Sequence, residues 1–126
     1  MNNNVDEVVK KIKSKIDVKG SYIGVIISVS YSEFADEITD KKELTFEEIG
    51  IRTLGKDMMQ NKVIFGKLGD KNVIVMLGRI HYSRGYEAAE VATPIYVLKE
   101  LGCEKLILCN SVGAITKKFR VGDIFT

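Results

Sequence analysis

The chain has 126 residues, of which 45% are hydrophobic, with 19 Lys and Arg against 17 Asp and Glu. This length points to one globular domain spanning residues 1–126, and the near balance of charge argues against a nucleic-acid-binding protein. The longest strictly apolar run, Val73–Leu77, is far shorter than the ~20 residues that span a bilayer. The amino terminus lacks the separate apolar block of a secretory signal, so we expect a cytoplasmic protein with no membrane or nucleic-acid partner.

The two cysteines, Cys103 and Cys109, form neither a CxxC pair nor a disulfide framework. We expect two reduced and mostly buried thiols.

The amino-terminal half predicts a helix followed by a buried strand. Apolar residues at helical spacing indicate an amphipathic helix that ends near Lys19-Gly20, formed around Val5, Val8, Val9, Ile12 and Ile16. The nearly continuous apolar run Tyr22–Ile27 predicts a strand buried on both faces. Beyond it we expect a helical stretch from Ser32, a strand near Glu48–Leu54 and a mobile loop near Gly55–Asn61.

The second half predicts a hairpin, a helix and two strands. Val63–Leu68 and Asn72–Leu77 flank a short turn that contains Gly69, which is typical of a β-hairpin. Glu87–Leu101 has helical periodicity and is closed by Gly102, while Pro94 either lies in a first turn capped by Thr93 or kinks the helix. Lys105–Cys109 predicts another buried strand, and Arg120–Thr126 the beginning of a further one.

These elements predict the fold class. Strand, helix and strand joined by short loops imply a right-handed parallel crossover, and the hairpin before it adds antiparallel strands. We therefore expect an α/β protein with a three-layer α/β/α arrangement and a mixed central sheet.

Three of the predicted strands end in turns of small or polar residues, namely Ser28-Val29-Ser30, Gly78-Arg79-Ile80-His81 and Asn110-Ser111-Val112-Gly113. In open α/β sheets, ligands bind at the carboxyl ends of the strands. An Arg fork, an imidazole, hydroxyls and backbone amides are the parts of an anion site. The alternative is structural, because Arg79 after a strand is typical of a surface ion pair and His81 of a structural hydrogen bond.

The motifs resemble purine nucleoside phosphorylases of the trimeric type. Their pattern reads G-R-[FI]-H-x-Y-E-G-Y, then a P-[IV]-x-V-x-K-x-L-G helix, T-N-A-A-G-G and V-G-D. The matching segments here begin at Gly78-Arg79-Ile80-His81 and end at Val121-Gly122-Asp123. Ile23-Gly24-Val25-Ile26 also resembles the family's first strand. The resemblance covers most of the chain and implies the first, amino-terminal half of the nucleoside phosphorylase fold, a truncated phosphorylase-like domain.

The family resemblance implies a pentosyltransferase of purine salvage. These enzymes split purine nucleosides with orthophosphate as co-substrate, without a metal or an organic cofactor, and give a free base and a pentose 1-phosphate. Arg79 and His81 match the family's phosphate-binding Arg and His, and Ser111 stands where a small residue offers its backbone N–H to phosphate. Ser28 and Ser30 occupy the two glycine positions of the family's phosphate loop and are further candidate phosphate ligands. Ser83 aligns with its sugar-contacting Tyr, with Tyr82 beside it, and Asn110 falls in the substrate pocket.

This chain also departs from the family pattern. Val29 replaces the serine of the G-S-G phosphate loop, Arg84 replaces the motif's Glu, and Gly55-Lys56-Asp57 stands in place of the P-G-H loop. The family's second half, which supplies the Glu and Asn that bind the purine, has no counterpart here. We therefore expect absent or very slow catalysis by this chain alone. The alternatives to an enzyme are a shortened non-catalytic paralogue acting as an anion-binding or assembly module, and a structural remnant with no ligand.

Half of the family's sheet is also unbuilt in these 126 residues. A homodimer or higher homo-oligomer is therefore expected, with the carboxyl-terminal strand or the first helix in the interface. The alternative is a monomer whose first helix folds over the open sheet edge.

Overall fold

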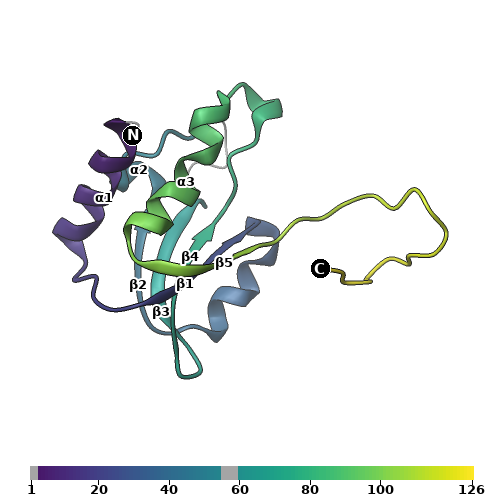
Figure 1. The fold of residues 1–126 in the computed structure, drawn as a ribbon, viewed down its shortest axis with the longest axis horizontal. Helices are drawn as coiled ribbons and strands as arrows, with labels where there is room; N and C mark the ends of the chain where they lie inside the picture. The colour runs from purple at the N-terminus through teal and green to yellow at the C-terminus, as the bar shows by residue number, and fades with distance from the viewer. Residues whose placement is uncertain (1–2, 55–59) are drawn as a thin grey trace.

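A five-stranded mixed sheet forms the centre of the protein (Figure 1), which we describe from a computed structural model covering residues 3–54 and 60–126. Its strand order is β2-β3-β4-β1-β5. The elements in chain order are α1 (Asn3–Lys15), β1 (Tyr22–Ile27), the 3₁₀ helix η1 (Val29–Glu37), β2 (Thr39–Thr45), α2 (Phe46–Ile49), β3 (Lys62–Leu68), β4 (Lys71–Leu77), the 3₁₀ turn η3 (Tyr82–Arg84), α3 (Ala88–Glu100) and β5 (Cys103–Leu108).

The strand directions divide the sheet into two parts. β1 runs parallel to both β4 and β5, whereas β2 and β3 pair antiparallel. β3 and β4 form the predicted hairpin, which turns at Gly69 with a φ of 61°. The carboxyl ends of β4, β1 and β5 therefore lie side by side at the same end of the sheet.

Helical segments cover both faces of this sheet, which confirms the α/β/α arrangement. On one face, α1, α2 and α3 enclose a core that includes Ile12, Phe46 and Leu98. On the other face, η1 places Ala35 over Val25 and Val75. The second outer layer is therefore the segment η1, which consists of two 3₁₀ pieces joined at a kink at Tyr31. No helix in the described ranges has both the length and the apolar character needed to cross a bilayer.

The first two helical segments differ from the sequence prediction. α1 ends at Lys15, before the predicted end near Lys19-Gly20, and the Ile16 N–H still donates to the carbonyl of Ile12 at 2.9 Å. The predicted helix from Ser32 is a 3₁₀ segment that begins earlier, at Val29. The Ser28 side chain caps it by accepting a hydrogen bond from the Ser30 N–H at 3.3 Å, which fixes this earlier start.

The predicted strand near Glu48–Leu54 is wrong. Residues 39–45 form β2 instead, and a short helix, α2, follows it. Thr45 and Glu48 make a capping box that starts this helix, and Gly50 ends it with a φ of 83°. The loop predicted over Gly55–Asn61 lies mostly outside the described residues.

Pro94 lies within α3 and not in its first turn, because the helix begins at Ala88. Thr93 is not a cap, since its hydroxyl donates to the carbonyl of Ala89 one turn earlier. Gly102 closes the helix as predicted, with a φ of 89° and its N–H bonded to the carbonyl of Lys99.

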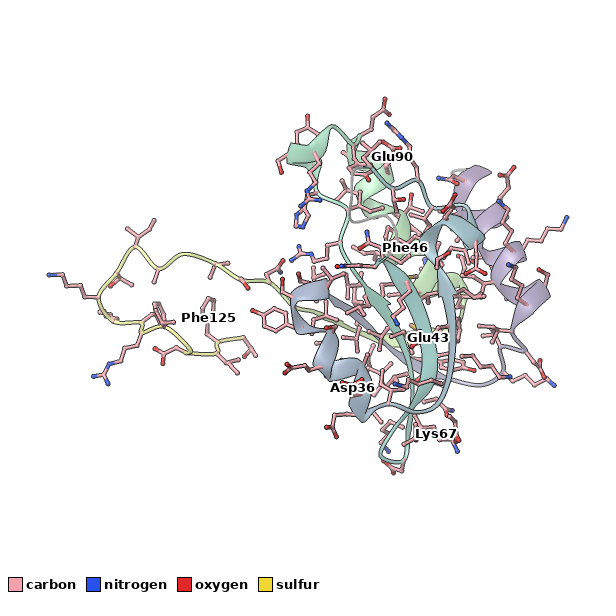
Figure 2. All side chains as sticks on the ribbon, turned by 180° about the vertical axis from the view of Figure 1, so that it is seen from behind. Asp36, Glu43, Phe46, Lys67, Glu90 and Phe125 are labelled. Atoms are coloured by element: carbon pink, nitrogen blue, oxygen red, sulfur yellow. The ribbon has the colours of Figure 1, made fainter. Side chains whose placement is uncertain are left out.

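β5 is an exposed edge strand and not the buried strand that was predicted. Its apolar residues Leu106, Ile107 and Leu108 are 43%, 53% and 47% exposed. The predicted strand over Arg120–Thr126 is also wrong, because residues 109–126 contain no regular element. This segment leaves the sheet after β5 and extends away from it (Figure 1), and Figure 2 shows Phe125 well separated from the sheet.

Candidate functional site

A sharp turn at Gly78 carries the chain out of β4. The Gly78 N–H donates to the carbonyl of Ile27 at the end of β1, at 2.8 Å. Gly78 has a φ of 105°, and a β-carbon there would collide with the side chain of Asn61. Only glycine fits this position without strain. The turn thus fixes where the next residue, Arg79, begins.

Arg79 reaches across the end of β1 to β5. Its Nη1 donates to the backbone carbonyl of Cys109 at 3.0 Å. Because β1 lies between β4 and β5, the half-buried guanidinium spans the end of the central strand. Cys109 is itself held by its N–H, which donates to the carbonyl of Ile26 at 2.9 Å. The hydrogen bond to Cys109 uses one of the five guanidinium N–H groups.

The serine loop after β1 bends back on itself. The Ser28 hydroxyl accepts from the Ser30 N–H and donates to the Ser30 hydroxyl, both at 3.3 Å. Val29, which stands between them, packs against the core beneath η1. The loop therefore turns its hydroxyl groups toward each other and its apolar side chain toward the sheet.

Ser111 is bonded to a residue that sequence reasoning missed. The Tyr31 hydroxyl and the Ser111 hydroxyl lie 2.9 Å apart, which joins the loop after β1 to the turn after β5. The partners are 80 residues apart in sequence. Only the pairing of β1 with β5 brings them together, so no local signal marks Tyr31.

The other predicted site residues lie at the surface nearby. His81 follows Arg79 in extended backbone, with φ −110° and ψ 129°, and is exposed. Tyr82 and Ser83 are exposed in η3, and Asn110 is exposed directly after β5. The structure thus brings Arg79 and Ser111 to the ends of β4 and β5, the two strands that flank β1, whereas the candidate sugar-binding positions form a separate turn.

The turn that carries these candidates is anchored by Tyr86. This buried phenol accepts a hydrogen bond from the Leu54 N–H. Arg52 lies over the Tyr86 ring, 5.7 Å from its centroid, and also bonds Glu90 at 2.9 Å. Tyr86 therefore serves as a support beneath the turn.

The ends of β4, β1 and β5 carry a half-buried guanidinium and several hydroxyl groups. A guanidinium fork and hydroxyl donors are groups that suit an oxyanion. Both cysteines are free and half-buried, and burial raises the pKa of the Cys103 thiol to about 11. That thiol stays protonated at neutral pH and is a poor nucleophile. Among residues 3–54 and 60–126, no three His, Cys, Asp or Glu side chains are grouped as metal ligands.

Comparison with known proteins identifies the family. Residues 22–125 match the sequence model of the phosphorylase superfamily. The chain belongs to the phosphorylase superfamily. Within this superfamily, it is 34% identical over 105 residues to purine nucleoside phosphorylase 1 of Bacillus subtilis, covering 81% of this chain and 38% of the relative. It is 29% identical over 121 residues to purine nucleoside phosphorylase 1 of Geobacillus stearothermophilus, covering 95% of this chain and 44% of the relative.

Solved phosphorylase structures show the same fold. The purine nucleoside phosphorylase of Schistosoma mansoni in complex with acetate superimposes with a TM-score of 0.86 at 30% identity, covering 97% of this chain and 45% of that one. The complex of the Schistosoma mansoni enzyme with inosine gives a TM-score of 0.85, also at 30% identity, and covers 97% of this chain and 42% of that one. The chain thus spans less than half the length of these superfamily relatives. Its architecture corresponds to the part of their fold with which it aligns.

Proposed function

We propose that this chain provides the phosphate-binding part of a purine nucleoside phosphorylase. The observation that carries the proposal is the Arg79 side chain, which spans the end of β1 and bonds the end of β5 at 3.0 Å. A cation held across three parallel strand ends is suited to an oxyanion and not to an apolar ligand.

The names of the relatives favour phosphate as that oxyanion. One structural neighbour is a purine nucleoside phosphorylase in complex with ribose 1-phosphate, and another is in complex with inosine. Both ligands belong to one reaction, in which phosphate replaces a purine on a pentose. These names support a phosphorylase in preference to the alternative of a binding or assembly module.

Each candidate residue has a role in that reaction. Arg79 and His81 hold phosphate beneath the sugar, and Ser111 donates a further hydrogen bond. Ser28 and Ser30 border the phosphate, whereas Ser83 and Tyr82 face the sugar and Asn110 lies in the pocket. Bond cleavage passes through an oxocarbenium-like transition state, so an anion fixed below the ring stabilises the positive charge that develops on the sugar. Positioning phosphate for attack also lowers the entropic part of the barrier.

Thermal unfolding in phosphate tests the binding part of this proposal. Phosphate that binds only the folded protein raises the melting temperature by mass action. We expect a saturable increase with phosphate or sulfate at constant ionic strength, with chloride as the control. An increase no larger than that in chloride would overturn the proposed function.

The rate of inosine phosphorolysis tests how much of the reaction this chain performs. Stabilising the departing base is a large part of transition-state binding, and no residue here matches the family's purine-binding Glu and Asn. With hypoxanthine release coupled to xanthine oxidase, we expect turnover far below the ordinary range of about 1 to 10³ per second. A turnover near one per second would show that the chain carries a complete site.

Self-association through the edge strand completes the proposal. The apolar residues of α1 are buried against α2 and α3, so this helix neither covers the β5 edge nor offers an apolar face. β5 has an open hydrogen-bonding edge. Pairing of this edge with the same edge of a second copy of the chain favours a homodimer or higher homo-oligomer. A cytoplasmic location stays a prediction.

A further inference from the structure

Tyr31 lies at an unusual point of the loop after β1. Its backbone, with φ −113° and ψ 36°, departs from helical geometry at the third residue of η1. The side chain is 50% exposed and directs its hydroxyl to Ser111 at 2.9 Å. Tyr31 therefore sits at a joint between two helical turns and contacts a proposed phosphate ligand.

The neighbouring serines are less available than their sequence suggests. The hydroxyls of Ser28 and Ser30 bond each other, and the Ser28 oxygen also caps η1. Val29 is directed into the core and has no polar group to offer. Among the side chains of residues 28–31, Tyr31 alone is bonded directly to the turn after β5.

We infer that the Tyr31 hydroxyl is an oxyanion ligand of the proposed phosphate site, supplying a donor that Val29 does not. This inference rests on the proposed function. In the observed arrangement, Tyr31 and Ser111 share one hydrogen bond, in which either oxygen can be the donor. When an oxyanion approaches, both hydroxyls donate to it, and one neutral hydrogen bond is exchanged for two to a charged acceptor. Hydrogen bonds with an ionised partner are roughly twice as strong as neutral ones.

The exposure of the phenol makes this exchange feasible. Both hydroxyls lie at the surface, so their reorientation opens no cavity in the core. The Arg79 guanidinium is held at the neighbouring Cys109 carbonyl, two residues before Ser111. Arg79 thus reaches the end of β5 from β4, and Tyr31 reaches it from β1, while Ser111 follows β5 itself.

Phosphate affinity of Tyr31→Phe tests this inference, because the substitution removes only the hydroxyl. A hydrogen bond to a charged group is worth about 1.5–3 kcal/mol, so we expect the dissociation constant for inorganic phosphate to rise about 10-fold or more. The matched control is Tyr96→Phe, since Tyr96 is 53% exposed on α3. Affinities come from the melting temperature of each variant against phosphate concentration, which corrects for any difference in starting stability.

Two further measurements separate a ligand from a residue that only positions Ser111. If Tyr31 acts only through Ser111, Tyr31→Phe has no effect on phosphate affinity in a Ser111→Ala background, which would contradict the inference; we expect a further loss. The chain has 5 Tyr and no Trp, so phosphate should also perturb the near-ultraviolet tyrosine absorbance in the wild type and in Tyr96→Phe, but much less in Tyr31→Phe.

The outcomes also separate this inference from the proposed function. Wild-type affinity in Tyr31→Phe, together with loss of binding in Arg79→Ala, would overturn the role of Tyr31 and leave the phosphate site standing. The absence of any phosphate effect on the wild-type protein would overturn both.

Discussion

Arg79 supplies the charge of the candidate site, and Gly78 fixes the position of Arg79. The guanidinium is anchored to the Cys109 carbonyl, and the turn before it depends on a glycine with a φ of 105°. Their motif, Gly78-Arg79-Ile80-His81, is visible in the sequence. The contact that completes the arrangement, between Tyr31 and Ser111, joins residues 80 positions apart and needs the strand order.

Removal of the Arg79 side chain should abolish the stabilisation by phosphate. We expect Arg79→Ala to show no phosphate-dependent rise in melting temperature, since the fork that holds two oxygen atoms is lost. The control is Lys67→Ala. Lys67 lies on β3, where it pairs with Asn72 near the start of β4, at the opposite end of the sheet from Arg79 (Figure 2). This variant loses the same charge and should keep the phosphate-dependent rise in melting temperature. An equal rise in wild type and Arg79→Ala would refute the assignment of Arg79.

Substitution of Gly78 should destabilise the protein strongly. The positive φ adds about 1–3 kcal/mol of strain for alanine, and the collision with Asn61 adds to it. Gly69 also has a positive φ, of 61°, but a β-carbon there meets nothing within 4 Å. Urea unfolding should therefore show a larger loss in Gly78→Ala than in Gly69→Ala, and equal losses would disprove the role of the close contact.

At the scale of elements, buried periodic segments are predictable and sheet edges are not. The strand Tyr22–Ile27 and the β3–β4 hairpin were predicted because their apolar residues are buried as the pattern implies. β2 was missed because it is an edge strand in which residues 39–43 are all exposed and mostly charged. β5 was predicted to be buried because its sequence is apolar, but its burial depends on what lies beyond the edge.

Acid should weaken the helix starts at α2 and α3. The Thr45 N–H lowers the pKa of Glu48, and the Glu87 N–H followed by Arg52 lowers that of Glu90. A carboxylate with a lowered folded-state pKa contributes stability above its unfolded value, near 4.5, and loses it as the pH falls through the folded value. The urea concentration at the midpoint of unfolding should therefore decrease as the pH is lowered below about 4.5.

Paired variants test this acid dependence. The double variant Glu48→Gln and Glu90→Gln should show a shallower fall of the urea midpoint between pH 5.5 and 3, because two of the responsible carboxylates are gone. Glu47→Gln, on the same helix as Glu48, is the control and should follow the wild-type profile. A double variant as acid-sensitive as the wild type would show that other groups cause the loss.

At the scale of the whole molecule, the sheet is covered on its faces but open at β5. Three exposed apolar residues in one edge strand favour pairing with another chain. The sequence predicted a need for such a partner. It did not show which surface is free, because that depends on α1 burying its apolar side against α3.

A charge placed on this edge should disrupt self-association. By light scattering at micromolar concentration, we expect a species larger than 14 kDa for the wild type and a monomer for Ile107→Lys. Ile115→Lys makes the same change at a fully exposed position beyond the strand, and should leave the assembly intact. A stable interface of this kind buries about 2,000 Å² or more. A wild-type protein that is monomeric under these conditions would end the proposal of self-association.

The central claim is that the joined ends of β4, β1 and β5 bind phosphate, and a crystal structure of the protein grown with phosphate tests it most directly. We predict the anion at hydrogen-bonding distance, about 3 Å, from the Arg79 guanidinium and the Ser111 hydroxyl. His81 should lie beside it, and the hydrogen bond between Tyr31 and Ser111 should be opened. Phosphate bound only at surface lysines, with the ends of β4, β1 and β5 unchanged, would contradict this claim.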